Sequence, residues 1–308
     1  GKLLLRVVDA KKQRVYETSA GLKVYYVLPG NSVFRGVTEI NNGRFNMEFI
    51  VPKDISYGGE DGRLSLYFWN DASEGTGHYE KLPVGGTAVN LVDHEGPEIT
   101  IKFGQEDFSS GDFTKPDPLL NVEISDSLSG VNIAGDIGHQ ISMILDDDQA
   151  AAKDMTQFFE YHSGSFTSGV LKYQLTGLTE GLHTLQIKAW DNSNNSSLVE
   201  TVFQVVADSV LTVRNLLNYP NPMTAHTQFS FELSNEARVT LKIFSVAGRL
   251  LKKFEPMFAT VGFNQISEIW DGRDEDGDLL ANGVYLYRLE AVRENAKVEK
   301  IGKVVIVR

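Results

Sequence analysis

The chain has 308 residues, a length typical of two or three modules that each bury a core. Hydrophobic residues make up 42% and charged residues 23%, which excludes a disordered tail. The formal net charge of -12 leaves no basic surface able to neutralise a run of phosphates, which argues against nucleic acid as a partner. The absence of cysteine excludes disulfides, thiolate zinc sites and a cysteine nucleophile within these residues. No apolar run approaches the roughly 20 residues of a membrane-spanning helix.

Apolar and polar residues alternate with a period of two along the whole chain, as in strands that bury one face. The clearest runs are Leu3, Leu5 and Val7; Leu185, Ile187 and Ala189; Phe229, Phe231 and Leu233; and Val239, Leu241 and Ile243. Turn signals separate the runs, at residues 41–43, 60–62, 180–181, 247–248 and 281–283. Helical periodicity is limited to Gln149 to Phe159, which predicts at most a short connecting helix. The sequence therefore predicts an all-β chain of tandem antiparallel β-sandwiches of the immunoglobulin-like type.

Two segments mark module boundaries. The first is VDHEGPEI at residues 92–99, where a charged Gly-Pro hinge precedes a new strand. The second lies around residues 207–221 and ends in NYPNP, whose prolines lack amide donors and favour an extended lead-in to a strand outside any ladder. The predicted modules are residues 1–94, 95–208 and 209–308. Because the chain begins abruptly on a strand-like segment, we interpret it as part of a larger protein.

The first two-thirds of the chain resembles a known region. The quoted blocks are LPGNSVFRG (28–36), NNGRFNMEFIVPKDISY (41–57), DGRLSLYFWNDASEGTG (61–77), GPEI (96–99), ISDSLSGVN (124–132), IGHQISMILDD (137–147), GLHTLQIKAWDNSNNSS (181–197) and FQV (203–205). In this order they resemble the region that follows the protease domain in gingipain-like C25 cysteine peptidases, specifically the type IX secretion sortase group.

The last segment resembles a second family. Its blocks are NYPNPMTAHTQFSFEL (218–233), VTLKIFSVAGRLL (239–251), IWDGRDEDGDLLANGVYLYRL (269–289) and KVVIVR (303–308). They are similar to the type IX C-terminal sorting domain, and the part from WDG to GVY is also shared with the immunoglobulin-like domain of the flagellar hook-capping protein.

Together the resemblances imply a support and attachment role on a secreted or outer-membrane surface protein of a bacterium. A peptidase domain with a His and Cys pair would precede Gly1, so no catalytic residue transfers to this chain. The implied partners are that upstream protease domain and the outer-membrane secretion machinery, which would recognise the terminal module. Whether the parent is a sortase, which keeps its terminal domain, or a cargo protein, which loses it, stays open.

Acidic clusters are the candidates for metal binding. Asp271, Asp274, Asp276 and Asp278 lie close together with Gly272 and Gly277. The pattern lacks the flanking helices and the final Glu of an EF-hand, so an irregular hairpin is favoured and a calcium site is the alternative. Asp191 begins a second cluster with Asn192, Asn194 and Asn195 that suits either backbone capping or calcium at the tip of a sandwich. Asp126, with Ser127, Ser129 and Gly130, is a weaker case.

Enzymatic chemistry has no support in the sequence. The six histidines (His78, His94, His139, His162, His183 and His226) lack metal-ligand spacing, and no nucleophile elbow, P-loop or dinucleotide fingerprint occurs. Aromatic residues at 67–69 and at Tyr285 and Tyr287 are interpreted as packing residues, with a sugar-stacking surface as the alternative. The prediction is a non-enzymatic chain without a cofactor. A calcium-dependent adhesin or carbohydrate-binding β-sandwich is the alternative function.

Overall fold

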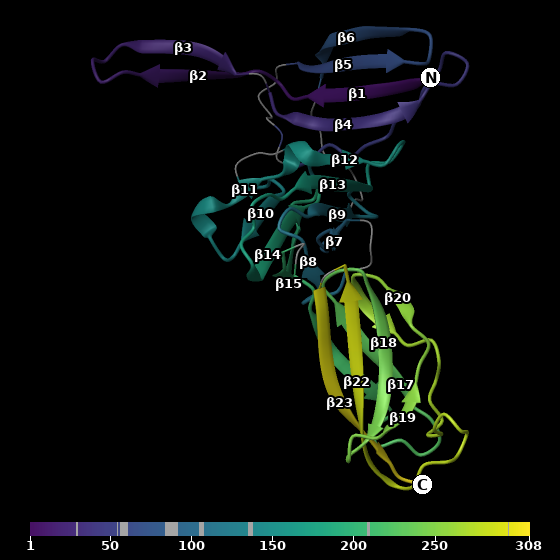
Figure 1. Cartoon of the computed structure of the whole chain (residues 1–308). Helices are drawn as coiled ribbons and strands as arrows, with labels where there is room; N and C mark the ends of the chain where they lie inside the picture. The colour runs from purple at the N-terminus through teal and green to yellow at the C-terminus, as the bar shows by residue number, and fades with distance from the viewer. Residues whose placement is uncertain are drawn as a thin grey trace. The chain divides into compact units, whose positions relative to one another are not determined.

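The computed structural model describes residues 1–28, 30–53, 55, 61–83, 92–104, 108–134, 138–207, 210–294 and 296–308 (Figure 1). The prediction of an all-β chain is confirmed, since these residues include no α-helix and form mainly antiparallel sheets. Two 3-10 helices, η1 (Gln149–Ala151) and η2 (Thr156–Phe158), occupy the segment expected to hold a short helix. Compact unit 1 comprises residues 1–110, 118–175 and 183–202, and unit 2 comprises residues 111–117, 176–182 and 203–308.

The first sheet of unit 1, here called the N-terminal sheet, has the strand order β4-β1-β5-β6. Its strands are β1 (Lys2–Val8), β4 (Ser32–Glu39), β5 (Gly62–Trp69) and β6 (Glu74–Leu82). Leu3, Leu5 and Val7 alternate along β1 and are all buried, as the period of two predicts. A separate hairpin joins β2 (Lys12–Glu17) to β3 (Lys23–Leu28), and every residue of β3 is exposed.

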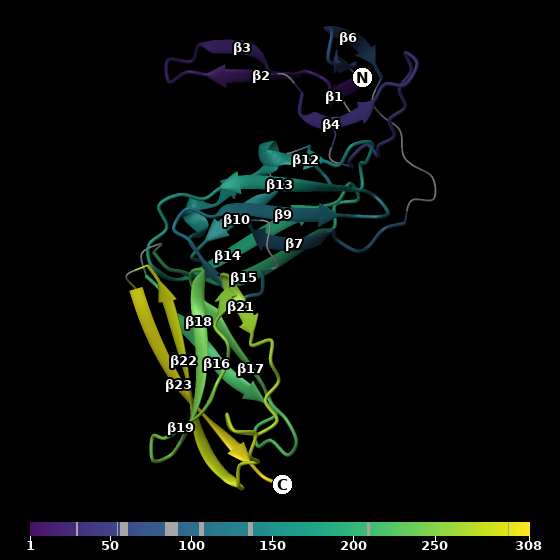
Figure 2. The same cartoon turned by 45° about the vertical axis from the view of Figure 1, so that its right-hand side comes forward.

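The next strands form the middle sandwich, whose two sheets are drawn in Figure 2. One sheet has the order β12-β13-β9-β7, formed by β7 (Glu98–Phe103), β9 (Leu119–Ser125), β12 (Phe159–Tyr161) and β13 (Ser168–Gln174). The other has the order β11-β10-β14-β15-β8, formed by β8 (Phe113–Thr114), β10 (Ser142–Leu145), β11 (Lys153–Asp154), β14 (Gly181–Trp190) and β15 (Ser196–Val205). The pair β8–β15 is parallel. Leu185, Ile187 and Ala189 of β14 are fully buried, as predicted.

The N-terminal sheet contacts the middle sandwich within unit 1. The ring of Phe34 on β4 stacks on Tyr161 of β12 with centroids 5.1 Å apart, and on Phe49 at 4.7 Å. Beside this contact, an Arg35 guanidinium nitrogen donates to the Phe159 carbonyl at 2.6 Å. The two parts of unit 1 therefore share buried aromatic contacts.

The C-terminal sandwich consists of the strands from β16 to β23. They are β16 (Val213–Tyr219), β17 (Gln228–Leu233), β18 (Ala237–Ser245), β19 (Leu250–Lys253), β20 (Met257–Ala259), β21 (Gly262–Gln265), β22 (Gly283–Arg293) and β23 (Ala296–Ile306). The sheets have the orders β16-β17-β21 and β19-β18-β22-β23, and β20 pairs with β18. The predicted inward residues of β17 and β18 are all buried.

The NYPNP segment differs in part from its prediction. Asn218 and Tyr219 belong to the ladder of β16 with β17, because their own amides precede the prolines and remain free to pair. Pro220 and Pro222 follow outside the strand, and both are preceded by cis peptide bonds.

Candidate metal centre

Three aspartates meet at one end of the middle sandwich because of how its strands pair. In the antiparallel pair β7–β9, Glu98 lies opposite Ser125, so the chain entering β7 lies beside the chain leaving β9. This places Asp93 near Asp126. β14 ends at Trp190, and the next residue, Asp191, forms an isolated bridge with Val131. Segments far apart in the sequence thus supply one carboxylate each.

The three side chains form a tight and buried group, here called the aspartate cluster (Asp93, Asp126 and Asp191). One carboxylate oxygen from each lies within 4.8 Å of the others. Asp93 is 6% exposed, Asp126 8% and Asp191 0%. Within the described ranges, no other group of three His, Cys, Asp or Glu side chains converges in this way. The cluster is therefore the strongest candidate for a metal centre in this part of the chain.

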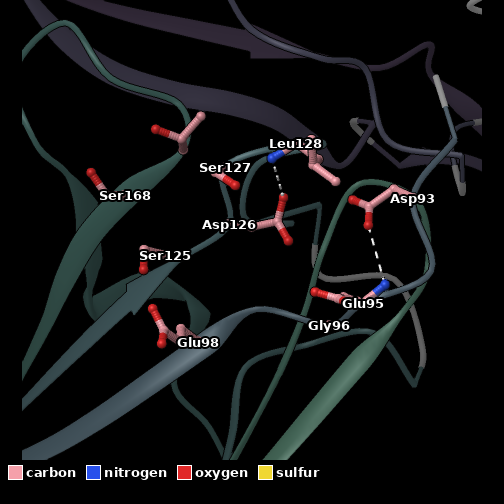
Figure 3. A pocket seen from close by; sticks show the side chains of 10 residues that line it. Asp93, Glu95, Gly96, Glu98, Ser125, Asp126, Ser127, Leu128 and Ser168 are labelled. Atoms are coloured by element: carbon pink, nitrogen blue, oxygen red, sulfur yellow. Dashed lines mark hydrogen bonds between the residues drawn. The ribbon is translucent and has the colours of Figure 1, made fainter. Parts of the chain in front are cut away.

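Two members of the cluster are fixed by backbone amides of their own loops. Oδ1 of Asp126 accepts from the amides of Leu128 at 3.1 Å, Ser129 at 2.7 Å and Gly130 at 2.8 Å, and Figure 3 shows the first of these bonds. Oδ1 of Asp191 accepts from the amides of Ser193 and Asn195 at 2.9 and 2.7 Å. The predicted capping role of these side chains is therefore present, and it holds the carboxylates in place.

Asp93 differs from the other two. Its Oδ1 accepts from the Glu95 amide at 3.2 Å, a bond drawn in Figure 3. Its Oδ2 is buried and accepts no hydrogen bond. In the described part of the chain, no Lys, Arg or His forms an ion pair with any member of the cluster. The ammonium of Lys53, which lies between β4 and β5, contacts the loop of Asp191 but donates to the Ser193 carbonyl, at 3.1 Å.

Burial and mutual repulsion act on the ionisation of the cluster. Burial raises the pKa of Asp191, and the nearby charge of Asp93 raises it further, although hydrogen bonds from Asn195 oppose both. Burial also acts to raise the pKa of Asp93, but Ser129, the Glu95 amide and the Asp191 carboxyl outweigh it and lower that pKa. Neighbouring buried carboxylates of this kind favour a shared proton or a bound cation.

A pocket of about 310 Å³ opens beside Asp93 and Asp126. Glu95 and Glu98 also line it, and Figure 3 shows these four carboxylates around the space. No Lys, Arg or His occurs among the described residues that line it. Gly96 lies at its wall, where a Cβ atom would come within 2.5 Å of the Ser196 backbone. The pocket is acidic and offers a route for a cation rather than for an anion.

The structure combines candidates that the sequence kept apart. The sequence pattern places Asp191 and Asp126 in separate clusters, and the fold brings them together. Asp93 was missed because its segment was interpreted only as a module boundary. No local signal marks Asp93, because it lies five residues before β7 and meets Asp126 only through the pairing of β7 with β9.

The acidic segment with the most carboxylates has a different geometry. Asp274 accepts from the amides of Asp276 at 3.1 Å and Asp278 at 2.9 Å, and Asp271 pairs with Arg273 at 3.2 Å. Gly272 and Gly277 have φ of 82° and 84°, the left-handed conformation that the hairpin interpretation requires. Among the described residues, no three of these four aspartates bring their carboxylate oxygens together as a metal-binding group.

The histidines and aromatic residues considered in the sequence differ in their burial and in their contacts. His183 contacts Asp146 at 2.8 Å, and the half-buried His139 packs edge-on against Trp190 with centroids 4.4 Å apart. Tyr287 is buried in the C-terminal core, whereas Tyr67 and Phe68 remain exposed on the N-terminal sheet.

The described ranges hold no helix with the length and apolarity that crossing a membrane requires.

Comparisons with known proteins give similarities among solved structures only. No protein-family model matches the chain, and no curated protein sequence matches it. Dimeric latent PorU from Porphyromonas gingivalis is 27% identical over 100% of this chain and 30% of that chain, with a TM-score of 0.38. PorZ, a surface component of the type IX secretion system of the same organism, is 15% identical over 92% and 49%, with a TM-score of 0.22.

An adhesin is also among the similar structures. A tetra-tandem repeat from the extending region of a large adhesion protein is 15% identical over 99% of this chain and 66% of that chain, with a TM-score of 0.23. The chain spans less than a third of the PorU chain that it matches.

Proposed function

We propose that this chain is the non-catalytic β-sandwich region of a secreted or surface C25-type cysteine peptidase of a bacterium. In this role the first two predicted modules, residues 1–94 and 95–208, support the peptidase domain. The third, residues 209–308, carries the contacts for type IX secretion or surface attachment. Catalysis belongs to the peptidase domain of the parent protein.

The observation that carries the proposal is the structural role of the terminal motifs. Met223 of NYPNPM, Trp270 of WDG and Tyr287 of the GVYLYRL block are buried in a single core. All of the buried members of that core lie between Leu211 and Ile306. The motifs that resemble a sorting domain therefore contribute to one shared core, which supports their assignment to a common module.

The outer surface of this sandwich offers an edge for recognition. β23 pairs with β22 and lies at the end of the strand order β19-β18-β22-β23. An edge strand can add a partner strand by main-chain hydrogen bonds. The C-terminal part of β23 is already covered, because the Met223 backbone is hydrogen-bonded to Val305 and Val307, so we consider the part of the edge that precedes Lys303. We place the contact with the secretion machinery on this edge or on the adjoining loops.

Removal of residues 209–308 from the full-length parent is expected to abolish export. The truncated protein should accumulate in the periplasm, because the part proposed to engage the outer-membrane machinery is gone. Cell fractionation and accessibility to added protease measure this directly. A full-length variant with Phe263→Ala, an exposed position of the same sandwich, serves as the control and should be exported. Normal surface display of the truncated protein would contradict the proposal.

A calcium-dependent adhesin or carbohydrate-binding sandwich is the second candidate, and the aspartate cluster favours it. This function requires that binding to glycans depends on calcium. A glycan array probed with calcium and with chelator separates the two candidates, since the first needs no glycan ligand. Silence in both conditions removes the second candidate.

A further inference from the structure

We propose that the aspartate cluster binds one calcium ion, which links the segment before β7, the loop after β9 and the loop after β14. This role is separate from export, which the proposal above assigns to the C-terminal sandwich. The ligands come from Asp93, Asp126 and Asp191, all within unit 1.

The buried Oδ2 of Asp93, which has no hydrogen-bond partner at bonding distance, is the observation that points to a ligand. Oδ2 is buried and accepts no hydrogen bond, although Oδ1 of the same carboxylate has the Glu95 amide. A buried carboxylate oxygen is strongly destabilised unless a donor or a cation faces it. A cation held by the three carboxylates supplies that partner.

The spacing of the cluster fits a single calcium ion. Calcium binds oxygen at about 2.3–2.6 Å, so two ligands on opposite sides of the ion are about 4.6–5.2 Å apart. The candidate oxygens of the three aspartates all lie within 4.8 Å of one another. One ion can therefore contact all of them, and the loop amides already hold Asp126 and Asp191 in position.

The loop after β14, which holds Asp191, also carries unpartnered oxygens. The Asn192 and Asn194 side-chain carbonyls and the Ser193 hydroxyl are buried and have no hydrogen-bond partner. Calcium takes about 6–8 oxygens and accepts amide carbonyls as well as carboxylates. Four unpartnered oxygens in two adjoining segments are unusual for a buried polar region, where nearly all such atoms are paired.

Calcium fits these ligands better than magnesium does. Magnesium loses its water reluctantly and usually keeps several water ligands. Here the carboxylates are almost fully buried, and Asp191 has no exposed surface. The acidic pocket lined by Glu95 and Glu98 concentrates cations next to Asp93 and Asp126.

Calorimetric titration of the full chain with calcium chloride, after dialysis against chelator, tests the proposal. We expect one site per chain, which Asp93→Asn and Asp126→Asn weaken roughly tenfold or more because each removes a ligand charge. Both asparagine variants keep the Oδ1 acceptor, so the amide contacts of the loops survive. Asp276→Asn, in the exposed acidic hairpin, is the matched control and should bind calcium like the parent chain.

Thermal unfolding distinguishes a bound ion from a purely structural role. In chelator, Asp93→Asn should melt at or above the temperature of the parent chain, because it removes one of three repelling buried charges. In calcium, the parent chain should gain stability and the variant should gain much less. Magnesium chloride in place of calcium should give a smaller shift.

Three results would overturn the inference. The first is the absence of both calcium-dependent heat and a melting shift in the parent chain. The second is calcium binding that persists unchanged in Asp93→Asn and Asp126→Asn, which would place the ion elsewhere. The third is an equal loss of stability by Asp93→Asn in calcium and in chelator, which a hydrogen-bonding role alone would produce. None of these results would affect export, which is measured separately.

Discussion

Replacing Trp270 with alanine is expected to lower the free energy of unfolding of the C-terminal sandwich by about 3–5 kcal/mol. Trp270 is 1% exposed and shares its core with Phe229, with ring centroids 6.4 Å apart. Its indole nitrogen also donates to the Arg273 carbonyl at 2.9 Å, which joins the core to the acidic hairpin. Alanine leaves both a large cavity and an unpaired carbonyl, so packing and hydrogen bonding are lost together.

Hydrogen exchange measures this effect locally and avoids a signal from the other sandwich. Peptides from β17 and β18 should lose most of their protection in Trp270→Ala, whereas peptides from β9 and β14 should not change. Phe263→Ala, at a side chain 62% exposed, is the matched control and should cost less than about 0.5 kcal/mol. Unchanged protection of β17 in Trp270→Ala would show that this core does not depend on its largest side chain.

Phe34→Ala is expected to have a comparable effect on unit 1, about 3–5 kcal/mol. Phe34 is 1% exposed and stacks on both Phe49 and Tyr161, so it connects the N-terminal sheet with β12. The Tyr161 hydroxyl donates to the Val131 carbonyl at 2.5 Å, and burial raises the pKa of Tyr161 well above its usual value. Loss of Phe34 removes the side chain that packs against this ring.

The expected result is a loss of exchange protection in β1, β4 and β12 together, because the two parts share these contacts. Tyr25→Ala, at an exposed ring on β3, is the control and should leave all three strands protected. A loss confined to β1 and β4 would mean that the N-terminal sheet folds independently of the middle sandwich.

The core positions could be predicted because a strand has a simple relation between sequence and burial. Successive side chains point to opposite faces, so a run such as Leu185, Ile187 and Ala189 identifies the inner face without knowledge of the partner strand. Tyr287, interpreted from the sequence as a packing residue, is also in the core.

The aspartate cluster was less accessible because it depends on pairing between distant strands. Asp93 and Asp126 become neighbours through the register of β7 with β9, which the sequence does not specify. Local density of carboxylates favoured the segment from Asp271 to Asp278 instead. There, short spacing lets the acids accept amides of their own turn, so density reflects turn chemistry rather than convergence.

Exposed aromatic residues show a second limit of the alternation argument. Tyr67 and Trp69 lie on the same face of β5 and stack with centroids 5.4 Å apart, yet Tyr67 is exposed. A period of two identifies residues that share a face, but it does not say whether another layer covers that face.

The most direct test of the proposed role asks whether the C-terminal sandwich suffices for export. A carrier protein that normally stays in the periplasm would be fused to residues 209–308 and expressed in a bacterium with a type IX secretion system. The carrier should reach the cell surface or the medium, and the same fusion with Trp270→Ala should not. Retention of the unaltered fusion in the periplasm, with the sandwich folded, would contradict the claim that this module is the secretion and attachment signal.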